Sequence, residues 1–430
     1  MTHRQRILAD RLLAGPIAFL FNAIARMLGA LLRRDHSVSA KNVRRIVVAK
    51  LIGMGSILQA TPLLRALKQK YPKAKLTFVT MQSNRELVNR LEWVDEVLAL
   101  DDRNVFVMAA TTLRVVAALI VRRIDLYFDL EVYSAFASLL ALWAVTRNRI
   151  GFYRYSATFK KGIYTQLVYF NTRMPVRQLY LQLGRVAGIP ATQSKITGPI
   201  RVDQVDRSAV RRILSESGHW RLEDPYVVVN PNASELLLER RWPASNAAEA
   251  VERLASLGYQ VVLTGAKEER CFVQTLYDGV TPGLRQRITN TAGRLTLGEL
   301  VALLEGAACV LTNDTGPMHM AIALQRPTVC LFGPVSPEHY GYDLATVEIF
   351  YTRVLCSPCV HEVDAPPCDG NNVCMQRIDP QMVVEAVQRF MRGELTTRTL
   401  LMRRKMDSLP LIVDGDQGTP LGVVARASLK

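Results

Sequence analysis

Four turns that follow predicted strands carry residue types suited to chemistry. They are Gly53 to Ser56, Asn230 to Ser234, Thr264 to Glu269, and Asn313 to Gly316. In an open α/β sheet, ligands bind beyond the carboxyl ends of the strands. These four turns are therefore the candidate site elements of the chain.

The last turn lies in the segment CVLTNDTGPMHMAIALQRPTVCLFGP and is the most distinctive of the four. It places Asp314, Thr315 and Gly316 between a predicted strand and a predicted helix. The first turn of a helix has free N–H groups and the positive end of the helix dipole, which suit phosphate oxygens. We expect His319 one turn into the helix, facing the loop. The alternative is that Asp314 or Thr315 only caps the helix.

The turn Gly53-Met54-Gly55-Ser56 has two glycines but lacks the full G-x-G-x-x-G pattern of a dinucleotide site. Gly53, Gly55 and Ser56 are candidates for donor binding. The alternative interpretation is a tight strand-to-helix turn that needs glycine torsion angles.

Four cysteines form a second constellation with the spacing Cys356-x2-Cys359-x8-Cys368-x5-Cys374. Thiolates are soft ligands, and short loops can bring four of them to one tetrahedral ion. This pattern predicts a structural zinc or iron site in a Cys-rich loop, 356–374, with His361 as an alternative ligand. A disulfide or a plain reduced loop is the competing interpretation.

Alternating strands and helices position these turns. The run RRIVVAK predicts a strand, residues 57–72 a helix, and AKLTFVT the next strand, which together make one βαβ unit. The alternation loosens around 175–225 and then resumes with PYVVVN. We therefore expect two doubly wound, Rossmann-like domains, at 41–200 and 201–393. Residues 394–430 lack clear periodicity and predict a partly disordered tail.

The N-terminal segment, residues 1–40, predicts an amphipathic helix. The apolar stretch between Arg11 and Arg26 is shorter than the roughly 20 residues that cross a bilayer. At helical spacing, apolar side chains from Leu13 to Leu31 fall on one face, and residues 1–45 carry nine Lys and Arg against two Asp. Such a helix suits the interface of an anionic membrane. Packing of its apolar face on the protein's own core is the alternative.

The overall charge favours anionic partners, because 54 Lys and Arg oppose 38 Asp and Glu. Nucleic acid is set aside as a partner, since the chain has no helix-turn-helix signature and no basic stripe with interleaved aromatic residues. Seven cysteines, an odd number, fit a reducing compartment better than a disulfide framework. A cytoplasmic location is expected.

The chain resembles glycosyltransferase family 9, the heptosyltransferases of lipopolysaccharide assembly, over roughly residues 44–390. The resemblance rests on four segments in order: RRIVVAKLIGMGSILQATPLLRALKQKYP, VVVNPNASELLLERRWP, NTAGRLTLGELVALLEGA and LTNDTGPMHMAIALQRPTVCLFGP.

The resemblance implies a GT-B fold, two facing Rossmann-like domains with a cleft between them. Such enzymes transfer sugar with inversion and need no metal or other cofactor for catalysis. The C-terminal domain would hold a nucleotide diphosphate sugar, and the N-terminal domain a lipid-linked or lipopolysaccharide-type glycan acceptor. The protein would be peripheral on the cytoplasmic face of the inner membrane.

The resemblance also assigns roles to individual residues. Arg240 or Arg241 would contact phosphate and offset the charge of the departing diphosphate. Glu268 falls near a position for ribose recognition. The residues that would hold the diphosphate and the neighbouring sugar follow one another in the chain: Asp314, Thr315, Gly316, Pro317, Met318 and His319.

One residue departs from the family pattern. The glycine turn of the family normally ends in Gly-Asp, whose aspartate is the proposed base for the acceptor hydroxyl, whereas Ser56 stands here. Serine cannot act as that base near neutral pH. Asp129 or Glu131, at the end of the predicted strand YFDLEVYS, would replace it. The alternative is a catalytically silent, GT-B-like nucleotide-binding scaffold at the membrane.

Overall fold

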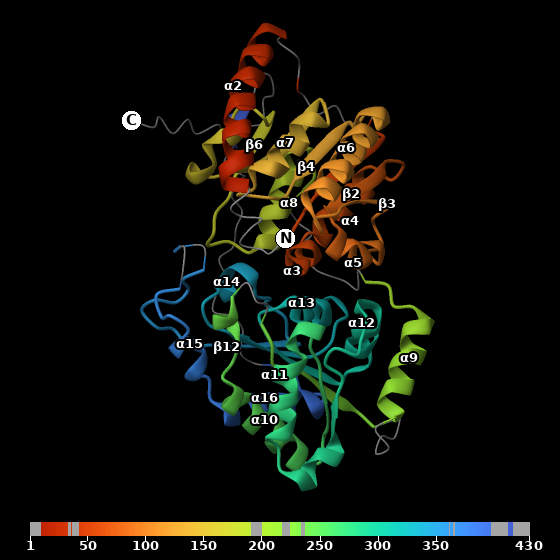
Figure 1. Cartoon of the computed structure of the whole chain (residues 1–430), viewed down its shortest axis with the longest axis vertical. Coiled ribbons are helices and arrows are strands. Elements are labelled where there is room, and N and C mark those ends of the chain that lie inside the picture. Colours follow the sequence, from red (N-terminus) through yellow and green to blue (C-terminus); the bar gives the residue numbers. More distant parts are fainter. Residues whose placement is uncertain are drawn as a thin grey trace. The chain divides into compact units, whose positions relative to one another are not determined.

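Alternating strands and helices build two sheets, one in each half of the chain (Figure 1). The computed structural model describes residues 10–32, 36, 43–190, 200–216, 224–233, 237–360, 362–363, 366–396 and 412–415. The chain divides into an N-terminal unit, residues 1–195 with 405–430, and a C-terminal unit, residues 196–404.

The sheet of the N-terminal unit has the strand order β13-β6-β5-β4-β1-β2-β3. All neighbouring strands are parallel except β13, which pairs antiparallel with β6. The strands are β1 (Arg45–Ala49), β2 (Lys75–Met81), β3 (Glu96–Leu100), β4 (Leu126–Asp129), β5 (Asn148–Tyr153), β6 (Gln166–Tyr169) and β13 (Ile412–Gly415).

Helices cover both faces of this sheet, which explains why β1 and β4 are buried along almost their whole length. One core contains residues from α2, α6 and α7, and α4 packs on α8. The helical segments are η1 (Asp10–Ala14, a π-helix), α2 (Gly15–Leu32), α3 (Met54–Gln59), α4 (Thr61–Lys70), η3 (Gln82–Asn84), α5 (Arg85–Asn89), α6 (Val105–Arg122), α7 (Ala135–Trp143), η4 (Tyr155–Lys160) and α8 (Val176–Val186).

The C-terminal unit repeats this plan with a fully parallel sheet of order β12-β11-β10-β7-β8-β9. Its strands are β7 (Tyr226–Asn230), β8 (Gln260–Leu263), β9 (Ile288–Asn290), β10 (Cys309–Asn313), β11 (Thr328–Phe332) and β12 (Val347–Tyr351). Its helical segments are α9 (Gln204–Ser215), η5 (Leu238–Arg240), α10 (Ala244–Ser256), η6 (Lys267–Glu269), α11 (Arg270–Asp278), η7 (Pro282–Arg287), α12 (Leu297–Gly306), α13 (Gly316–Ala323), α14 (Pro337–Tyr340), α15 (Val373–Gln376) and α16 (Pro380–Met391).

The predicted N-terminal helix exists, and it packs by its less apolar face. Ala14, Ala18 and Asn22 are buried in the N-terminal unit, whereas Leu20 and Met27 are exposed. The small side chains allow α2 to approach α7 closely. Phe21 packs on Trp143, whereas the other large apolar side chains of α2, among them Phe19, Leu20 and Met27, remain exposed.

The next findings concern the C-terminal tail and the one helix that could cross a membrane. Within the predicted tail, 412–415 forms β13 against β6, while 397–411 and 416–430 lie outside the described residues. Within the described residues, α6 is the one helix long and apolar enough to cross a membrane by length and composition alone.

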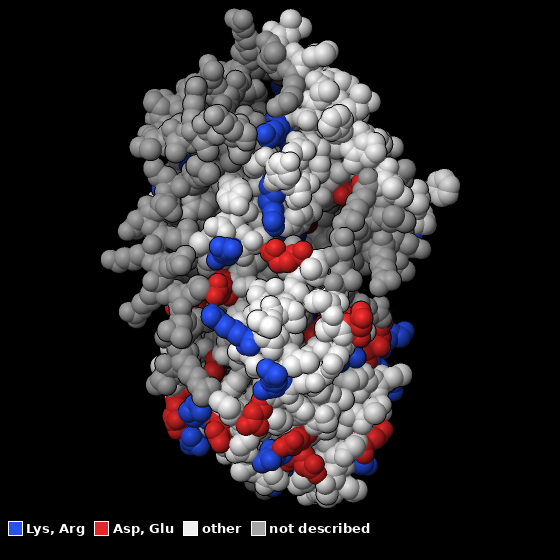
Figure 2. All heavy atoms as spheres, turned by 90° about the vertical axis from the view of Figure 1, so that its left-hand side faces the viewer, with Lys and Arg blue, Asp and Glu red and all other residues white. Residues whose placement is uncertain are grey.

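The positive charge of the protein is concentrated in one half of the sequence. Residues 1–195 carry 30 Lys and Arg against 11 Asp and Glu, whereas residues 196–430 carry 24 against 27. On the face in Figure 2, acidic and basic side chains are intermingled over the C-terminal unit. The excess of positive charge therefore lies in the N-terminal half of the sequence.

Candidate active site

Each unit has its own topological switch point. The central strands β1 and β7 each begin their unit, and the chain then crosses to β4 and β10 on the opposite side. Ligands of open α/β sheets bind at such points. Asp129 ends β4 and Asn313 ends β10, so the predicted site residues after these strands occupy equivalent places in the two units.

In the C-terminal unit, a web of amide and hydroxyl groups fixes the loop between β10 and α13. Asn230 donates from Nδ2 to Thr312 Oγ1 at 3.1 Å and to Thr315 Oγ1 at 3.0 Å. Asn313 donates to the carbonyl oxygens of Pro231 and Asn232 at 3.0 and 2.9 Å. The ends of β7 and β10 are thereby tied together, and Thr315 is held in one orientation.

Asp314 lies at the centre of this loop and contacts two potentially cationic side chains. Its Oδ2 is 3.6 Å from Arg240 Nη1, its Oδ1 is 3.8 Å from His319 Nε2, and Arg240 also donates to its carbonyl oxygen at 3.1 Å. Burial raises the pKa of Asp314, and Arg240 opposes that rise. Arg240 is thus fixed against the loop that follows β10.

The first turn of α13 receives no side-chain cap. Thr315 occupies the N-cap position with extended torsion angles, but its hydroxyl is engaged by Asn230 rather than by the helix. The interpretation that Asp314 or Thr315 only caps the helix is therefore wrong. The N–H groups of the first turn keep their capacity to bind an anion.

The remaining donor candidates separate by burial. Thr315, Gly316 and Pro317 are partly exposed, whereas Met318 is fully buried and Asp314 and His319 nearly so. The side chain of Met318 belongs to the core, so this residue can contact the donor only through its backbone N–H in the first turn of α13. The Nδ1 atom of His319 is 2.7 Å from the hydroxyl of Tyr342, and this contact fixes the imidazole ring.

The structure distinguishes the two candidate arginines. Arg240 reaches Asp314 and is 21% exposed, whereas Arg241 stacks on the ring of Phe272 at 4.0 Å. Burial lowers the pKa of Arg241, and nearby Glu269 opposes this. Arg240 is therefore the better phosphate ligand. Glu268 is exposed in η6 and contacts none of these residues in the described structure.

In the N-terminal unit, Glu131 holds the turn that follows β1. Its Oε1 atom accepts hydrogen bonds from Lys50 Nζ at 2.8 Å, Leu51 N at 2.8 Å and Ile52 N at 3.1 Å. Burial would raise the pKa of Glu131, but Lys50 and the two backbone amides outweigh it, and the pKa is lowered. Within the described residues Oε2 has no hydrogen bond, and the side chain is 13% exposed.

Asp129 does not share this accessibility. It accepts hydrogen bonds from the Tyr164 hydroxyl and, at 2.9 Å, from Glu131 N, and its side chain is fully buried 3.5 Å from Lys160 Nζ. Burial raises the pKa of Asp129, against the effect of Lys160. A carboxylate with no exposed atom cannot reach a sugar hydroxyl, so the structure does not support Asp129 as the base.

The glycine turn serves the same arrangement. Gly53 has a φ of +92°, which side chains of other residues rarely tolerate, and it begins α3 with its carbonyl bonded to Ile57 N at 3.1 Å. Ser56 lies in the first turn of α3, as does Gly55. These three residues lie in the N-terminal unit, while the loop around Asp314 lies in the C-terminal unit.

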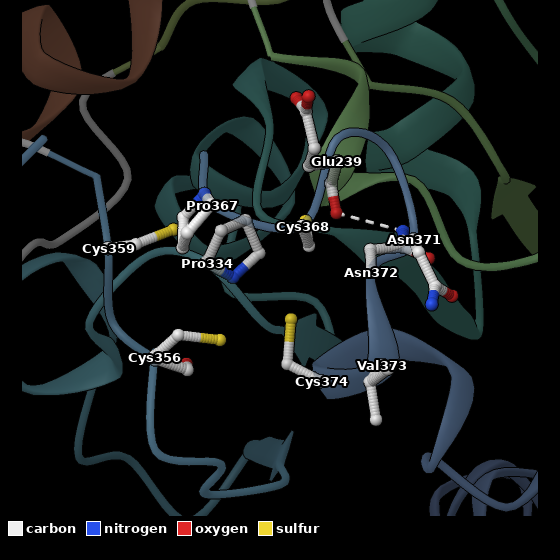
Figure 3. Close-up of a pocket in the computed structure, with 11 residues that line it drawn as sticks. Glu239, Pro334, Cys356, Cys359, Pro367, Cys368, Asn371, Asn372, Val373 and Cys374 are labelled. Carbon is white, nitrogen blue, oxygen red and sulfur yellow. Dashed lines mark hydrogen bonds between the residues drawn. The ribbon is translucent and has the colours of Figure 1, made fainter. Parts of the chain in front are cut away.

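The four predicted metal ligands line one pocket of about 60 Å³, together with Glu239 and Asn372 (Figure 3). Figure 3 shows Cys356, Cys359 and Cys374 pointing into this space. All seven cysteines are unpaired. Among the described residues, however, no three Cys, His, Asp or Glu side chains are close enough together to hold one ion, and His361 lies outside the described residues. The predicted metal site is not formed in this arrangement.

Asn372 links this loop to Arg240, and sequence reasoning missed it. Its Nδ2 atom donates to the carbonyl oxygens of Glu239 at 3.0 Å and Arg241 at 2.7 Å, the residues on either side of Arg240. Lys50 and Tyr342 were missed as well. Of the three residues, only Lys50 could have been found from the sequence, because it is a charged residue at the end of an apolar run. Asn372 and Tyr342 make contacts with residues that are distant in the sequence.

Comparison with known proteins identifies the family to which the chain is similar. The profile of glycosyltransferase family 9 (heptosyltransferase) matches residues 109–368. Lipooligosaccharide heptosyltransferase 2 of Haemophilus influenzae is 35% identical over 117 residues, which are 27% of this chain and 34% of that relative. Lipopolysaccharide heptosyltransferase 2 of Salmonella typhimurium is 25% identical over 68% of this chain and 84% of its own length.

A solved structure shares the fold. The ADP-heptose lps heptosyltransferase II of Escherichia coli superposes with a TM-score of 0.66 at 21% identity, over 82% of this chain and 99% of that one. This similarity confirms the predicted α/β architecture of the GT-B type.

Proposed function

The chain belongs to glycosyltransferase family 9 and is a transferase, and on this basis we propose that it moves a heptose-type sugar from a nucleotide diphosphate sugar to a lipopolysaccharide-type, lipid-linked acceptor. The observation that carries the proposal is the uncapped start of α13 beside Arg240. Together they offer backbone N–H groups and a guanidinium to a diphosphate. The names of the relatives support a heptose donor carried on ADP.

The proposed reaction is a displacement at the anomeric carbon with inversion. The acceptor hydroxyl forms the new C–O bond while the bond from that carbon to the diphosphate breaks. Arg240 and the N–H groups of α13 stabilise the charge that accumulates on the leaving diphosphate. Glu131, ionised and held by Oε1, takes the hydroxyl proton on Oε2.

Glu131 is proposed as the base because Ser56 cannot act as a base near neutral pH and the carboxylate of Asp129 is fully buried. Three hydrogen bonds fix Oε1, Oε2 accepts none from the described residues, and the Glu131 side chain is 13% exposed. An oxygen without a hydrogen bond can accept a proton, provided that the base lies within hydrogen-bond reach of the proton it removes.

A transfer assay tests the proposal. The purified protein is incubated with ADP-heptose and a truncated lipopolysaccharide acceptor, and the acceptor mass is followed. A gain of one heptosyl residue, with release of ADP, is expected. Parallel reactions with UDP- and GDP-sugars serve as controls for the nucleotide. ADP-heptose that neither binds nor reacts, with any acceptor, would contradict the donor assignment.

We further propose that the protein is peripheral at the cytoplasmic face of the inner membrane through α2. The exposed apolar side chains of α2, among them Phe19, Leu20 and Met27, support this location. A lipid-linked acceptor is confined to that surface, so an enzyme held there encounters it more often. Flotation with anionic vesicles, compared with a Phe19→Ser/Leu20→Ser/Met27→Ser variant, tests it: the variant should stay in the soluble fraction.

The Cys-rich loop is proposed to take up a structural metal after rearrangement of its thiols. The support is the convergence of all four cysteines on one pocket. Burial raises the pKa of Cys374 to about 11, an effect that metal binding would reverse. Metal analysis of protein purified under reducing conditions tests this, with Cys356→Ser as the disrupting variant and the exposed Cys271→Ser as its matched control. Protein free of zinc and iron that folds normally would contradict it.

A further inference from the structure

Helix α6 is apolar on two opposite sides. Thr112, Val115 and Leu119 are buried on the inner side. On the outer side Phe106 is 87% exposed, Leu113 71% and Val121 79%. Phe106, Leu113 and Val121 are each about two helical turns apart, so they lie on one side of the helix and form a stripe. A contiguous apolar surface of this kind on a soluble helix indicates an interaction site.

The fold determines how this stripe can meet a membrane. Although α6 is apolar enough to cross a bilayer, it connects β3 to β4 of the same sheet, and its inner side belongs to the core. A helix that crossed a bilayer would have to leave that core and carry the two strands to opposite sides. Only the outer stripe is available, so α6 can lie along a lipid surface but cannot span it.

The stripe faces the same side of the N-terminal unit as α2. Ala18 of α2 and Val115 and Leu119 of α6 belong to one core on one face of the sheet. Helix α7 contacts both helices, and Figure 1 shows the three together in this unit. Because both helices cover the same face of the sheet, their outward side chains can meet one plane.

The charged residues of this unit indicate what kind of surface the two helices can contact. Arg114 and Arg123 are exposed on α6 and just after it. They belong to a half of the sequence, residues 1–195, in which 30 basic residues oppose 11 acidic ones. A basic, apolar surface fits lipid that carries negative head groups, because the side chains enter the interface while the arginines pair with phosphate.

We propose that α6 is a second lipid-contacting helix, which lies flat in the head-group region of an anionic bilayer beside α2. This inference rests on the proposed membrane location and adds to it a contact that the N-terminal helix does not make. Two helices on one face would also fix the orientation of the N-terminal unit on the membrane, which a single helix cannot do.

The test measures binding of the full-length protein to vesicles of equimolar phosphatidylcholine and phosphatidylglycerol. A Phe106→Ser/Leu113→Ser/Val121→Ser variant removes the stripe without touching the core. The expected loss in partition coefficient is about 10- to 100-fold, since three apolar side chains no longer enter the interface. The matched control, Val205→Ser/Leu257→Ser/Met382→Ser, removes exposed apolar residues of the C-terminal unit and should bind as wild type does.

A second readout reports depth. Leu113→Trp should gain fluorescence quenching by brominated lipid over that of the native tryptophans. Unchanged binding of the α6 variant, with binding lost on substitution of Phe19, Leu20 and Met27 in α2, would overturn the α6 proposal and leave the membrane location standing. A wild-type protein that does not bind these vesicles would overturn both. Equal losses in the α6 variant and its control would overturn the α6 proposal.

Discussion

The two units place an acidic side chain at the same point of their sheets and hold it in different ways. After β4, Glu131 is bound by one lysine and two backbone amides, and its pKa is lowered. After β10, Asp314 is buried beside Arg240 and His319, and its pKa is raised. The first arrangement maintains an ionised oxygen near the surface, whereas the second uses the carboxylate to position other groups. A shared topology therefore does not imply a shared role.

Glu131→Gln should produce the largest change if the glutamate is the base. Turnover is expected to fall by about 10²- to 10⁴-fold, the usual contribution of a general base, while donor affinity stays close to wild type. Steady-state transfer kinetics and calorimetry with ADP measure the two quantities separately.

Two variants control for this result. Asp129→Asn removes a buried carboxylate and should lower stability more than turnover, while Ser56→Ala should change turnover by less than about twofold. Full activity of Glu131→Gln would contradict the assignment of the base.

Arg240→Gln addresses the other half of the comparison. Loss of one cationic donor to the leaving diphosphate should lower turnover by about 10²- to 10³-fold. Arg241→Gln is the matched control, because Arg241 follows Arg240 in the sequence but stacks on Phe272. This substitution should lower turnover much less. Equal effects of the two substitutions on turnover would show that the geometry does not distinguish the arginines.

The loop after β10 should respond more mildly. Thr315→Val removes a hydroxyl that Asn230 holds, and His319→Ala breaks the contact with Tyr342. Each loses about one hydrogen bond, which corresponds to roughly 5- to 10-fold weaker nucleotide binding. Calorimetry with ADP measures this, and thermal unfolding confirms that the fold is intact. Unchanged affinity in both variants would remove the loop from the donor site.

The smallest expected effect is on how the free energy of unfolding depends on pH. The contributions of Glu131 and Asp314 to this dependence should have opposite signs. Because the folded pKa of Glu131 is lowered, its stabilising contribution is present above its ordinary pKa and is lost as pH falls through the folded value. The raised pKa of Asp314 has the opposite sign, since its ionised form disfavours folding as pH rises. Compared with wild type, Glu131→Gln should flatten the loss of stability below about pH 4.5. Asp314→Asn should flatten the loss of stability that begins as pH rises above the ordinary aspartate pKa of about 3.9. Urea unfolding across pH checks both, and equal slopes in all three proteins would refute the difference.

Local patterns in the sequence predicted most of the fold. The alternation of strands and helices, the switch-point loops and the N-terminal helix all follow from periodicity and turn residues that lie close together in the chain. Among the site residues, the position of Asp314 and the choice of Glu131 or Asp129 came from strand ends.

What the sequence could not supply was contact between distant segments. Burial distinguishes Glu131 from Asp129, although only one residue lies between them, and the contact partners Asp314 and Phe272 distinguish Arg240 from Arg241. The link from Asn372 to the carbonyls around Arg240 joins residues more than a hundred positions apart. The two apolar sides of α6 likewise cannot be told apart in the sequence, and only the packed sheet shows which one is buried.

The turn held by Glu131 has a consequence for the evolution of the family. Gly53 adopts a positive φ, and the amides of Leu51 and Ile52 just before it donate to one carboxylate oxygen. If the carboxylate has taken over the work of the missing aspartate, the two positions should exchange together among related sequences. Chains with aspartate at the position of Ser56 would tolerate other residues at 131, whereas chains with serine there would retain glutamate. A pair of positions so far apart in sequence would then carry a record of how one catalytic group replaced another.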